Sequence, residues 1–155
     1  MIDEAKFGAK IACAQGRMMD FVKDLGLNRV CIGFSGGKDS RCILDMARDL
    51  YPHIITIHNG HTGEDPGDED GVLCIHPPKA ENAPAFHKLV DIKGQIDGTR
   101  RDEDDYVMID GVDIHRSKMT GPFASGGIWG LEVCFPIWDW TEEEVYFYLG
   151  ERVTA

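Results

Sequence analysis

The sequence predicts a doubly wound α/β fold, a mainly parallel sheet flanked by helices, over one domain spanning residues 1–155. Short apolar runs rich in β-branched residues alternate with amphipathic segments of helical period, which is the pattern of βαβ units. The runs show little alternation of polar and apolar residues, as expected of parallel strands buried on both faces. A glycine-rich turn follows the first run, where sheets of this kind bind ligands.

Two helices and three strands are predicted in the first half of the chain. The helices cover residues 3–25 and 40–51, and the strands cover residues 28–34, 53–60 and 71–75. Each helix carries an apolar stripe, and Gly26 and Pro52 end them. Between the second and third strands, the glycine-rich and acidic segment 61–71 predicts an exposed loop.

The second half of the chain is predicted to add a helix, a strand, a hairpin and a last helix. The predicted segments are a helix at 81–90, a strand within 90–103, a hairpin at 106–115, a glycine-rich loop at 119–130, a strand-like run at 131–135 and a helix from 141 to 149. Asp110-Gly111 lies between apolar residues and predicts a type I′ turn. Thr141 and Glu144 have the spacing of a capping box. The loop stretch 123–130 is either a substrate lid or an ordinary loop.

The charge, the hydrophobic runs and the cysteines argue against an extended nucleic acid, a membrane and a zinc site as partners. There are 27 acidic and 16 basic residues, giving a net charge of -11, and this surface would repel an extended nucleic acid. No run reaches the roughly 18 apolar residues that span a bilayer, so we expect a cytoplasmic protein without a membrane partner. The five cysteines lack the spacing of a zinc site, and we expect buried thiols in a reducing compartment.

The turn SGGKDS, residues 35–40, has the composition of an anion-binding site. Two glycines let an anion approach the backbone N–H groups, and the following helix contributes the positive end of its dipole. Hydroxyl and ammonium donors come from Ser35, Lys38 and Ser40. Asp39 would either cap the helix or meet magnesium. An ordinary P-loop and a dinucleotide fingerprint both need a different glycine spacing. The alternative that the glycine turn is only structural and binds no ligand is also left open.

Three segments together carry a resemblance to a known family. SGGKDS after a hydrophobic strand resembles the signature of the PP-loop, or adenine nucleotide alpha-hydrolase-like, superfamily. IDGTRRDE (residues 96–103) and PIWDWTEEEVYFYL (residues 136–149) resemble two segments of its PAPS reductase and ATP sulfurylase small-subunit branch. The three segments cover most of the chain in order. The resemblance implies a HUP-like fold and an adenine nucleotide ligand, either ATP or PAPS, with Mg²⁺.

The resemblance also implies roles for individual residues. The phosphates would lie on Ser35, Gly36, Gly37, Lys38, Asp39 and Ser40. The adenine side would be lined by Gly33 and Phe34, and the stretch after the second strand would contribute His61, Thr62 and Gly63, with His61 in place of the family's aspartate. The second motif is matched by Gly98, Arg100 and Glu103, with Arg101 beside them as a second phosphate clamp. The catalytic candidates are Lys38, Asp39 and Arg100, and Asp39 is the candidate magnesium ligand.

The departures from the family leave the activity open. The chain lacks the C-terminal E-C-G motif of thiol-type PAPS reductases, so sulfonucleotide reduction would need an external thiol, or Cys134 as a substitute. The alternatives are an enzyme that transfers a nucleotidyl group to an unknown acceptor and releases pyrophosphate, and a module that only binds the nucleotide. Relatives often dimerise, and a homodimer through the aromatic last helix is one expectation. We expect His53 and His58 at the surface or at a strand edge.

Overall fold

The computed structural model describes residues 2–58, 69–74 and 91–152. Its main sheet has six strands in the order β3-β2-β1-β4-β8-β7. The strands are β1 (Val30–Gly33), β2 (Ile55–His58), β3 (Val72–Cys74), β4 (Gly94–Ile96), β7 (Phe123–Ala124) and β8 (Glu132–Cys134). All neighbouring pairs are parallel except β7 with β8. The prediction of a mainly parallel sheet is confirmed, and β7 lies in the segment that the sequence predicted to be a loop.

β1 occupies the centre of the sheet, with β2 on one side and β4 on the other. The chain passes from β1 outward to β2 and β3, and then returns to β4 on the opposite side. The strand order therefore reverses between β1 and β4, and the chain continues from the carboxyl ends of these two strands toward opposite sides of the sheet. Ligands of open parallel sheets bind at such switch points. The turn of residues 35–40 leaves β1 at this place.

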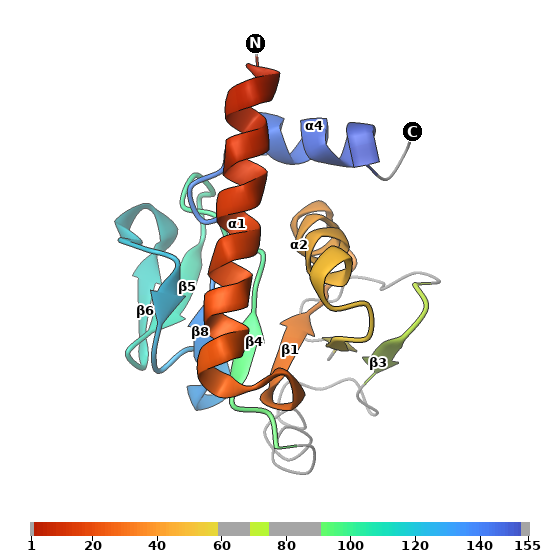
Figure 1. Ribbon diagram of the computed structural model, residues 1–155. Helices are drawn as coiled ribbons and strands as arrows, with labels where there is room; N and C mark the ends of the chain where they lie inside the picture. Colours follow the sequence, from red (N-terminus) through yellow and green to blue (C-terminus); the bar gives the residue numbers. More distant parts are fainter. Residues whose placement is uncertain (1, 59–68, 75–90, 153–155) are drawn as a thin grey trace.

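Two helices, α1 (Glu4–Leu25) and α2 (Lys38–Leu50), lie on one face of the sheet, and α4 (Glu142–Arg152) packs against α2 near the N-terminal end of α1, as Figure 1 shows. Val30 and Ile32 of β1 belong to the buried core beneath them, whereas Cys31 belongs to a second cluster on the opposite face, with Ile57. Alternate residues of β1 thus enter two cores, which explains why its sequence is apolar throughout. The helix predicted at 81–90 lies outside the described residues.

The predicted end of α1 at Gly26, the predicted capping box and the predicted hairpin are confirmed. Asp3 accepts hydrogen bonds from the first backbone N–H groups of α1. At the start of α4, Thr141 N donates to Glu144 Oε1 at 2.9 Å and Glu144 N donates to Thr141 Oγ1 at 3.2 Å, which is a reciprocal capping box. Strands β5 (Tyr106–Ile109) and β6 (Val112–His115) are antiparallel. Their turn residues, Asp110 and Gly111, both have positive φ, as a type I′ turn requires.

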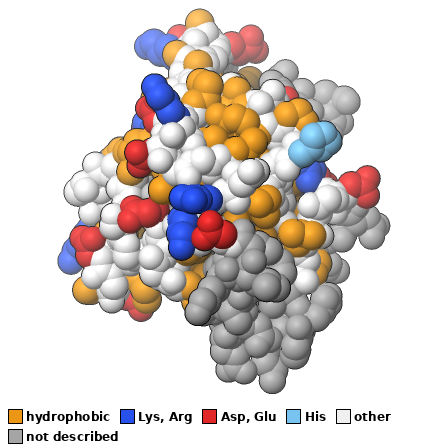
Figure 2. Space-filling view, turned by 60° about the horizontal axis from the view of Figure 1, so that its bottom comes forward, with side chains coloured by type: hydrophobic (Ala, Val, Ile, Leu, Met, Phe, Trp, Pro, Cys, Tyr) orange, Lys and Arg blue, Asp and Glu red, His pale blue; other side chains and the backbone are white. Residues whose placement is uncertain are grey.

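The described helices and the charged side chains of the surface bear on the kinds of partner the protein can have. Among the described helices, none has the length and hydrophobicity that crossing a membrane requires. On the face shown in Figure 2, acidic and basic side chains lie among hydrophobic and uncharged ones, and neither sign forms a continuous strip over the described residues.

Candidate functional site

A cavity of about 580 Å³ opens at the carboxyl ends of β1, β2 and β4. The hairpin β5–β6 and residues from β8 complete its wall. Its polar lining comes from Ser35, Asp39, Ser40, His58, Gln95, Asp97, Thr99, Glu103, Asp105, Tyr106, Asp113 and Arg116. Apolar side chains such as Phe34, Ile57 and Phe135 line the rest. The volume lies within the range of about 300–1,000 Å³ that small-molecule sites occupy.

The glycine turn is closed on itself by its two serines. Ser40 Oγ accepts from the backbone N–H groups of Ser35 and Gly36, each at 3.2 Å, and Ser35 Oγ accepts from Gly37 N at 3.2 Å. Gly36 has φ +95°, a conformation that favours glycine. The N–H groups of the turn therefore converge on hydroxyl oxygens, at the start of α2 where the helix dipole is positive.

At two glycines of the site, a neighbouring atom lies where a side chain would begin. A Cβ on Gly33 would lie 2.5 Å from Gln95 Nε2, and a Cβ on Gly98 would lie 2.9 Å from the backbone carbonyl carbon of Asp39. Both distances are shorter than real Cβ contacts allow, so a side chain at either position would displace its neighbour. Gly98 thus lets the segment after β4 lie directly against the first turn of α2.

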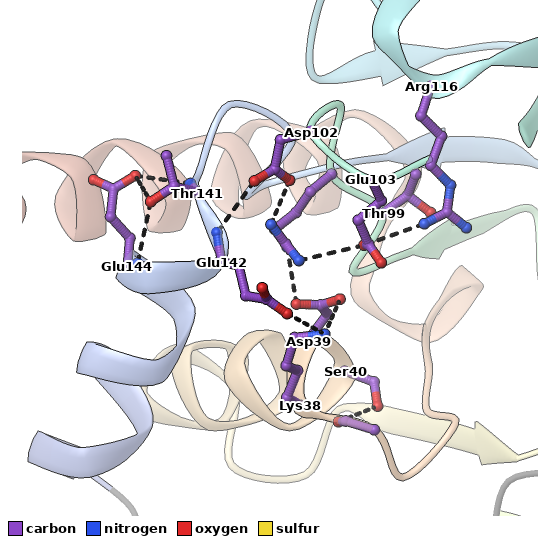
Figure 3. Close-up of polar contacts among 12 residues, drawn as sticks. Lys38, Asp39, Ser40, Thr99, Asp102, Glu103, Arg116, Thr141, Glu142 and Glu144 are labelled. Atoms are coloured by element: carbon purple, nitrogen blue, oxygen red, sulfur yellow. Dashed lines mark hydrogen bonds and ion pairs between the residues drawn. The ribbon is translucent and has the colours of Figure 1, made fainter. Parts of the chain in front are cut away.

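Arg100 joins the beginnings of α2 and α4 through the carboxylates of Asp39 and Asp102. Figure 3 shows these two carboxylates beside Glu142, the first residue of α4. Its side chain is only 1% exposed, and Nε donates to Asp39 Oδ1 at 2.9 Å. Nη1 donates to Asp102, whose other oxygen accepts from Glu142 N at 3.2 Å. Burial alone would lower the pKa of Arg100, but the carboxylates of Asp39, Asp102 and Glu103 outweigh burial and raise it. The guanidinium is therefore charged and held by carboxylates.

Asp39 and Glu103 supply two carboxylates to the cavity. Burial raises the pKa of Glu103, and the nearby Asp39 raises it further, while Arg100 and Arg116 oppose them. Glu103 Oε1 is buried and makes no hydrogen bond within the described part of the chain, although Arg116 Nη1 lies 3.2 Å away. Asp39 does not cap α2, whose N-cap is Gly37.

The carboxylate pair is compatible with magnesium brought by a nucleotide. Residues 2–58, 69–74 and 91–152 contain no group of three or more His, Cys, Asp or Glu side chains arranged to hold a metal ion. Magnesium, however, is usually held by one or two carboxylates together with the oxygens of substrate phosphates. Asp39 and Glu103 are two carboxylates that line the cavity, so these two residues are the candidate ligands.

The structure brings some of the predicted site residues together and separates others. The predicted residues that line the cavity are Gly33, Phe34, Ser35, Asp39, Ser40, Gly98 and Glu103. Lys38 points toward α4, with Nζ 3.6 Å from Glu142 Oε1. Neither arginine of the predicted phosphate clamp lines the cavity, because Arg100 is held by carboxylates and Arg101 lies over the Trp138 ring, 4.9 Å from its centroid. The predicted contacts His61, Thr62 and Gly63 lie outside the described residues.

Several lining residues were not predicted from the sequence. The expectation that His58 lies at the surface or at a strand edge is wrong, because β2 is an inner strand and His58 is 7% exposed. Gln95 and Asp97 line the cavity beside β1, and Arg116 reaches it from the end of the hairpin. His58 and Gln95 are polar residues beside the apolar Ile57 and Ile96 in their strands, a signal that the sequence does carry. The sequence around Arg116 contains no comparable pattern that would mark it as a residue of the cavity.

The expectation of buried thiols is confirmed for Cys31, Cys42 and Cys134, and it is wrong for Cys13 and Cys74, which are exposed. The buried cysteines are unsuited to nucleophilic chemistry. Cys134, considered as a substitute redox residue, is fully buried, and burial raises the pKa of its thiol. Burial likewise raises the pKa of Cys31, to about 12. A thiol is reactive only as the thiolate, so the buried thiol of Cys134 gives no support to the hypothesis that it replaces the missing redox cysteine.

No protein-family model matches the chain, and no curated protein matches its sequence significantly. The fold and the cavity define the chain as an α/β protein with a mainly parallel sheet and a candidate ligand site at its switch point.

Proposed function

We propose that this chain is a PP-loop-type protein with a doubly wound, HUP-like fold that binds an adenine nucleotide, ATP or PAPS, at residues 35–40. The observation that supports the proposal is the convergence of three segments far apart in the sequence. Arg100 links the start of α2, the segment after β4 and the start of α4, and the cavity lies beside this junction. These are the three segments on which the family resemblance rests.

The turn would bind the phosphates through its backbone. The N–H groups of Ser35, Gly36 and Gly37 now donate to the two serine hydroxyls. A phosphate oxygen is a stronger acceptor than a hydroxyl, so the nucleotide would take over these donors, and the serine hydroxyls would then donate to it as well. The dipole of α2 adds a favourable field.

The same arrangement supports nucleotidyl transfer. An oxyanion of the acceptor would attack the α-phosphorus of ATP, forming the new P–O bond while the bond to pyrophosphate breaks. The turn would neutralise the charge that develops on the leaving pyrophosphate. Magnesium, held by Asp39 and Glu103, would withdraw charge from the phosphate oxygens. Arg100 would act as a positioning residue that keeps Asp39 at the cavity. With PAPS, cleavage of the sulfonyl group would require an external thiol.

A non-catalytic nucleotide-binding module is the second candidate, and one observation favours it. Lys38 and Arg100, two of the three catalytic candidates, pair with carboxylates of the protein and do not line the cavity. Pyrophosphate release separates the candidates. Incubation with ATP, Mg²⁺ and a panel of carboxylate acceptors gives steady release from an enzyme, and binding without release from a module. The cytoplasmic location and the homodimer stay predictions.

A matched pair of glycine variants tests the binding site. Gly36 and Gly26 both have φ +95°, but only Gly36 belongs to the turn, and a Cβ on Gly26 meets nothing within 4 Å. Alanine at either position would therefore have to adopt a positive φ, which costs about 1–3 kcal/mol. We expect Gly36→Ala to weaken ATP binding at least tenfold in calorimetry, roughly the effect of 1.4 kcal/mol, and Gly26→Ala to leave it unchanged. Equal affinities in both variants would contradict the proposed site.

A further inference from the structure

A serine, a histidine and an aspartate are joined by hydrogen bonds at the open end of the β5–β6 hairpin. Ser117 Oγ lies 2.7 Å from His115 Nδ1, and His115 Nε2 lies 2.8 Å from Asp104 Oδ1. Asp104 precedes β5 and Ser117 follows β6, so the pairing of the two strands brings them together. Nucleophilic enzymes place a hydroxyl, a base and an orienting carboxylate in this order. The nucleotide site proposed above uses none of the three residues.

The hydrogen bonds determine which atom carries each proton. A carboxylate only accepts, so His115 Nε2 carries a hydrogen and donates it to Asp104. In the neutral ring, Nδ1 is then an acceptor, and the backbone N–H of Ser117, which can only donate, points to it at 3.2 Å. The hydroxyl of Ser117 must therefore donate to Nδ1 as well. Its proton already points at the nitrogen that would remove it.

The imidazole ring of His115 is held on several sides. In the hairpin, His115 pairs with Tyr106, and the two rings meet edge to face with their centroids 5.5 Å apart. The neighbouring Arg116 fastens the strand end, because its backbone N donates to Asp105 O at 2.9 Å and its Nε donates to Tyr106 O at 3.2 Å. The side chain of His115 is 30% exposed, so water reaches only part of it. The base therefore needs little reorganisation to accept the proton.

His115 lies on the face of the hairpin that borders the cavity. Cross-strand partners, and residues two positions apart in a strand, share one face of a hairpin. Three residues of the face that carries His115 line the cavity: Tyr106, Met108 and Asp113. On the other face, Val107 and Ile109 pack against the buried cluster that contains Phe135. The three hydrogen-bonded residues therefore stand beside a cavity that can hold the body of a substrate.

We propose that Ser117 is a nucleophile for acyl transfer from small carboxylic esters, with His115 as its base and Asp104 as the residue that holds the base. This activity is separate from the nucleotide chemistry proposed above. Ser117 Oγ attacks the carbonyl carbon of the ester while its hydrogen passes to His115 Nδ1. As the ester C–O bond breaks, the departing alcohol takes that hydrogen. Water then hydrolyses the acyl-serine by the same proton path, which releases the acid and restores the hydroxyl.

A fluorophosphonate probe tests the nucleophile, since it forms an O–P bond to an activated serine and loses fluoride. The full chain is incubated with the probe, and mass spectrometry locates the label. Ser125 is the internal control, because it is exposed like Ser117 but its Oγ donates directly to a carboxylate oxygen, Glu132 Oε2, at 2.7 Å. We expect Ser117 to be labelled about 100-fold faster than Ser125, the lower end of what a positioned base contributes.

Three variants assign the roles. His115→Asn retains an acceptor for Ser117 but removes the base, so labelling of Ser117 should fall about 100-fold, to the rate of Ser125. Asp104→Ala should slow the labelling only about threefold, because Asp104 is fully exposed and its interaction is screened by water. In the hydrolysis of p-nitrophenyl acetate, Ser117→Ala should lower turnover at least about tenfold, although the imidazole of His115 is still present.

Each other outcome contradicts a defined part of this inference. Equal labelling of Ser117 and Ser125 in the wild-type chain would show that the hydroxyl is not activated. Undiminished labelling of Ser117 in His115→Asn would exclude His115 as the base, and an unchanged rate in Asp104→Ala would remove Asp104 from the relay. Ester hydrolysis that persists in Ser117→Ala would assign the turnover to the imidazole alone and overturn acyl transfer through the serine. The wild-type comparison needs no variant, and circular dichroism shows whether each variant is folded.

Discussion

Arg100→Met tests whether the buried guanidinium holds the two helix starts together. The side chain is 1% exposed and pairs with Asp39, Asp102 and Glu103, whose side chains are 17%, 39% and 29% exposed. Removal of one partner from a buried ion pair costs about 3–5 kcal/mol. Because water reaches these carboxylates in part, we expect the free energy of unfolding to fall by about 2–3 kcal/mol at pH 7. For a chain of 155 residues, the melting temperature would fall by roughly 4–12 °C.

Arg29→Met is the control, because Arg29 pairs with Asp91 at 3.3 Å while both side chains are 58% exposed. We expect a loss below about 0.5 kcal/mol there. Urea unfolding followed by circular dichroism at pH 7 and at pH 4 measures both variants. Arg100 lowers the pKa of Glu103, so its removal raises that pKa, and the deficit of Arg100→Met should shrink as the pH falls and Glu103 becomes neutral. Equal losses in the two variants, or a deficit that does not shrink in acid, would refute the reasoning.

Two further predictions concern an ion pair and the thiols. Burial opposes ionisation of Asp139, but its hydrogen bond and ion pair with Arg17 hold the pKa of that carboxyl below its ordinary value of 3.8. Asp139→Asn should therefore lower the free energy of unfolding by about 1–2 kcal/mol at pH 7. In thermal melts, the difference from wild type should disappear as the pH falls through the folded-state pKa of Asp139. A difference that persists at pH 2 would contradict this prediction. Iodoacetamide followed by mass spectrometry should label the exposed thiols of the native chain and reach the buried ones only after unfolding. The exposed thiols are Cys13 and Cys74, and the buried ones are Cys31, Cys42 and Cys134. Rapid native labelling of a buried thiol would show that its surroundings open.

The local features of this protein could be predicted from the sequence because neighbouring residues determine them. Asp3 caps α1, Asp110 and Gly111 make the hairpin turn, and Thr141 with Glu144 opens α4, and each depends on residues within a few positions. The parallel strands were readable because burial on both faces makes them apolar throughout. The glycine turn, too, was evident from its composition.

The orientation of the site residues could not be predicted in this way. Arg100 was predicted from the sequence to clamp a phosphate together with Arg101. In the folded chain it lies among carboxylates from α2 and from its own segment instead. His58 and Gln95 became candidates only when β2 and β4 were placed on either side of β1. The direction of a charged or polar side chain depends on partners up to a hundred residues away, which no local pattern specifies.

The sequence by itself determined the α/β class, the order of most elements and the position of the glycine turn, since these follow from residue spacing and backbone preference. Only the tertiary structure decided which polar groups face the cavity and which neutralise one another. The physical reason is that a buried charge must be paired wherever the fold brings a partner, and partners are chosen by packing between distant segments.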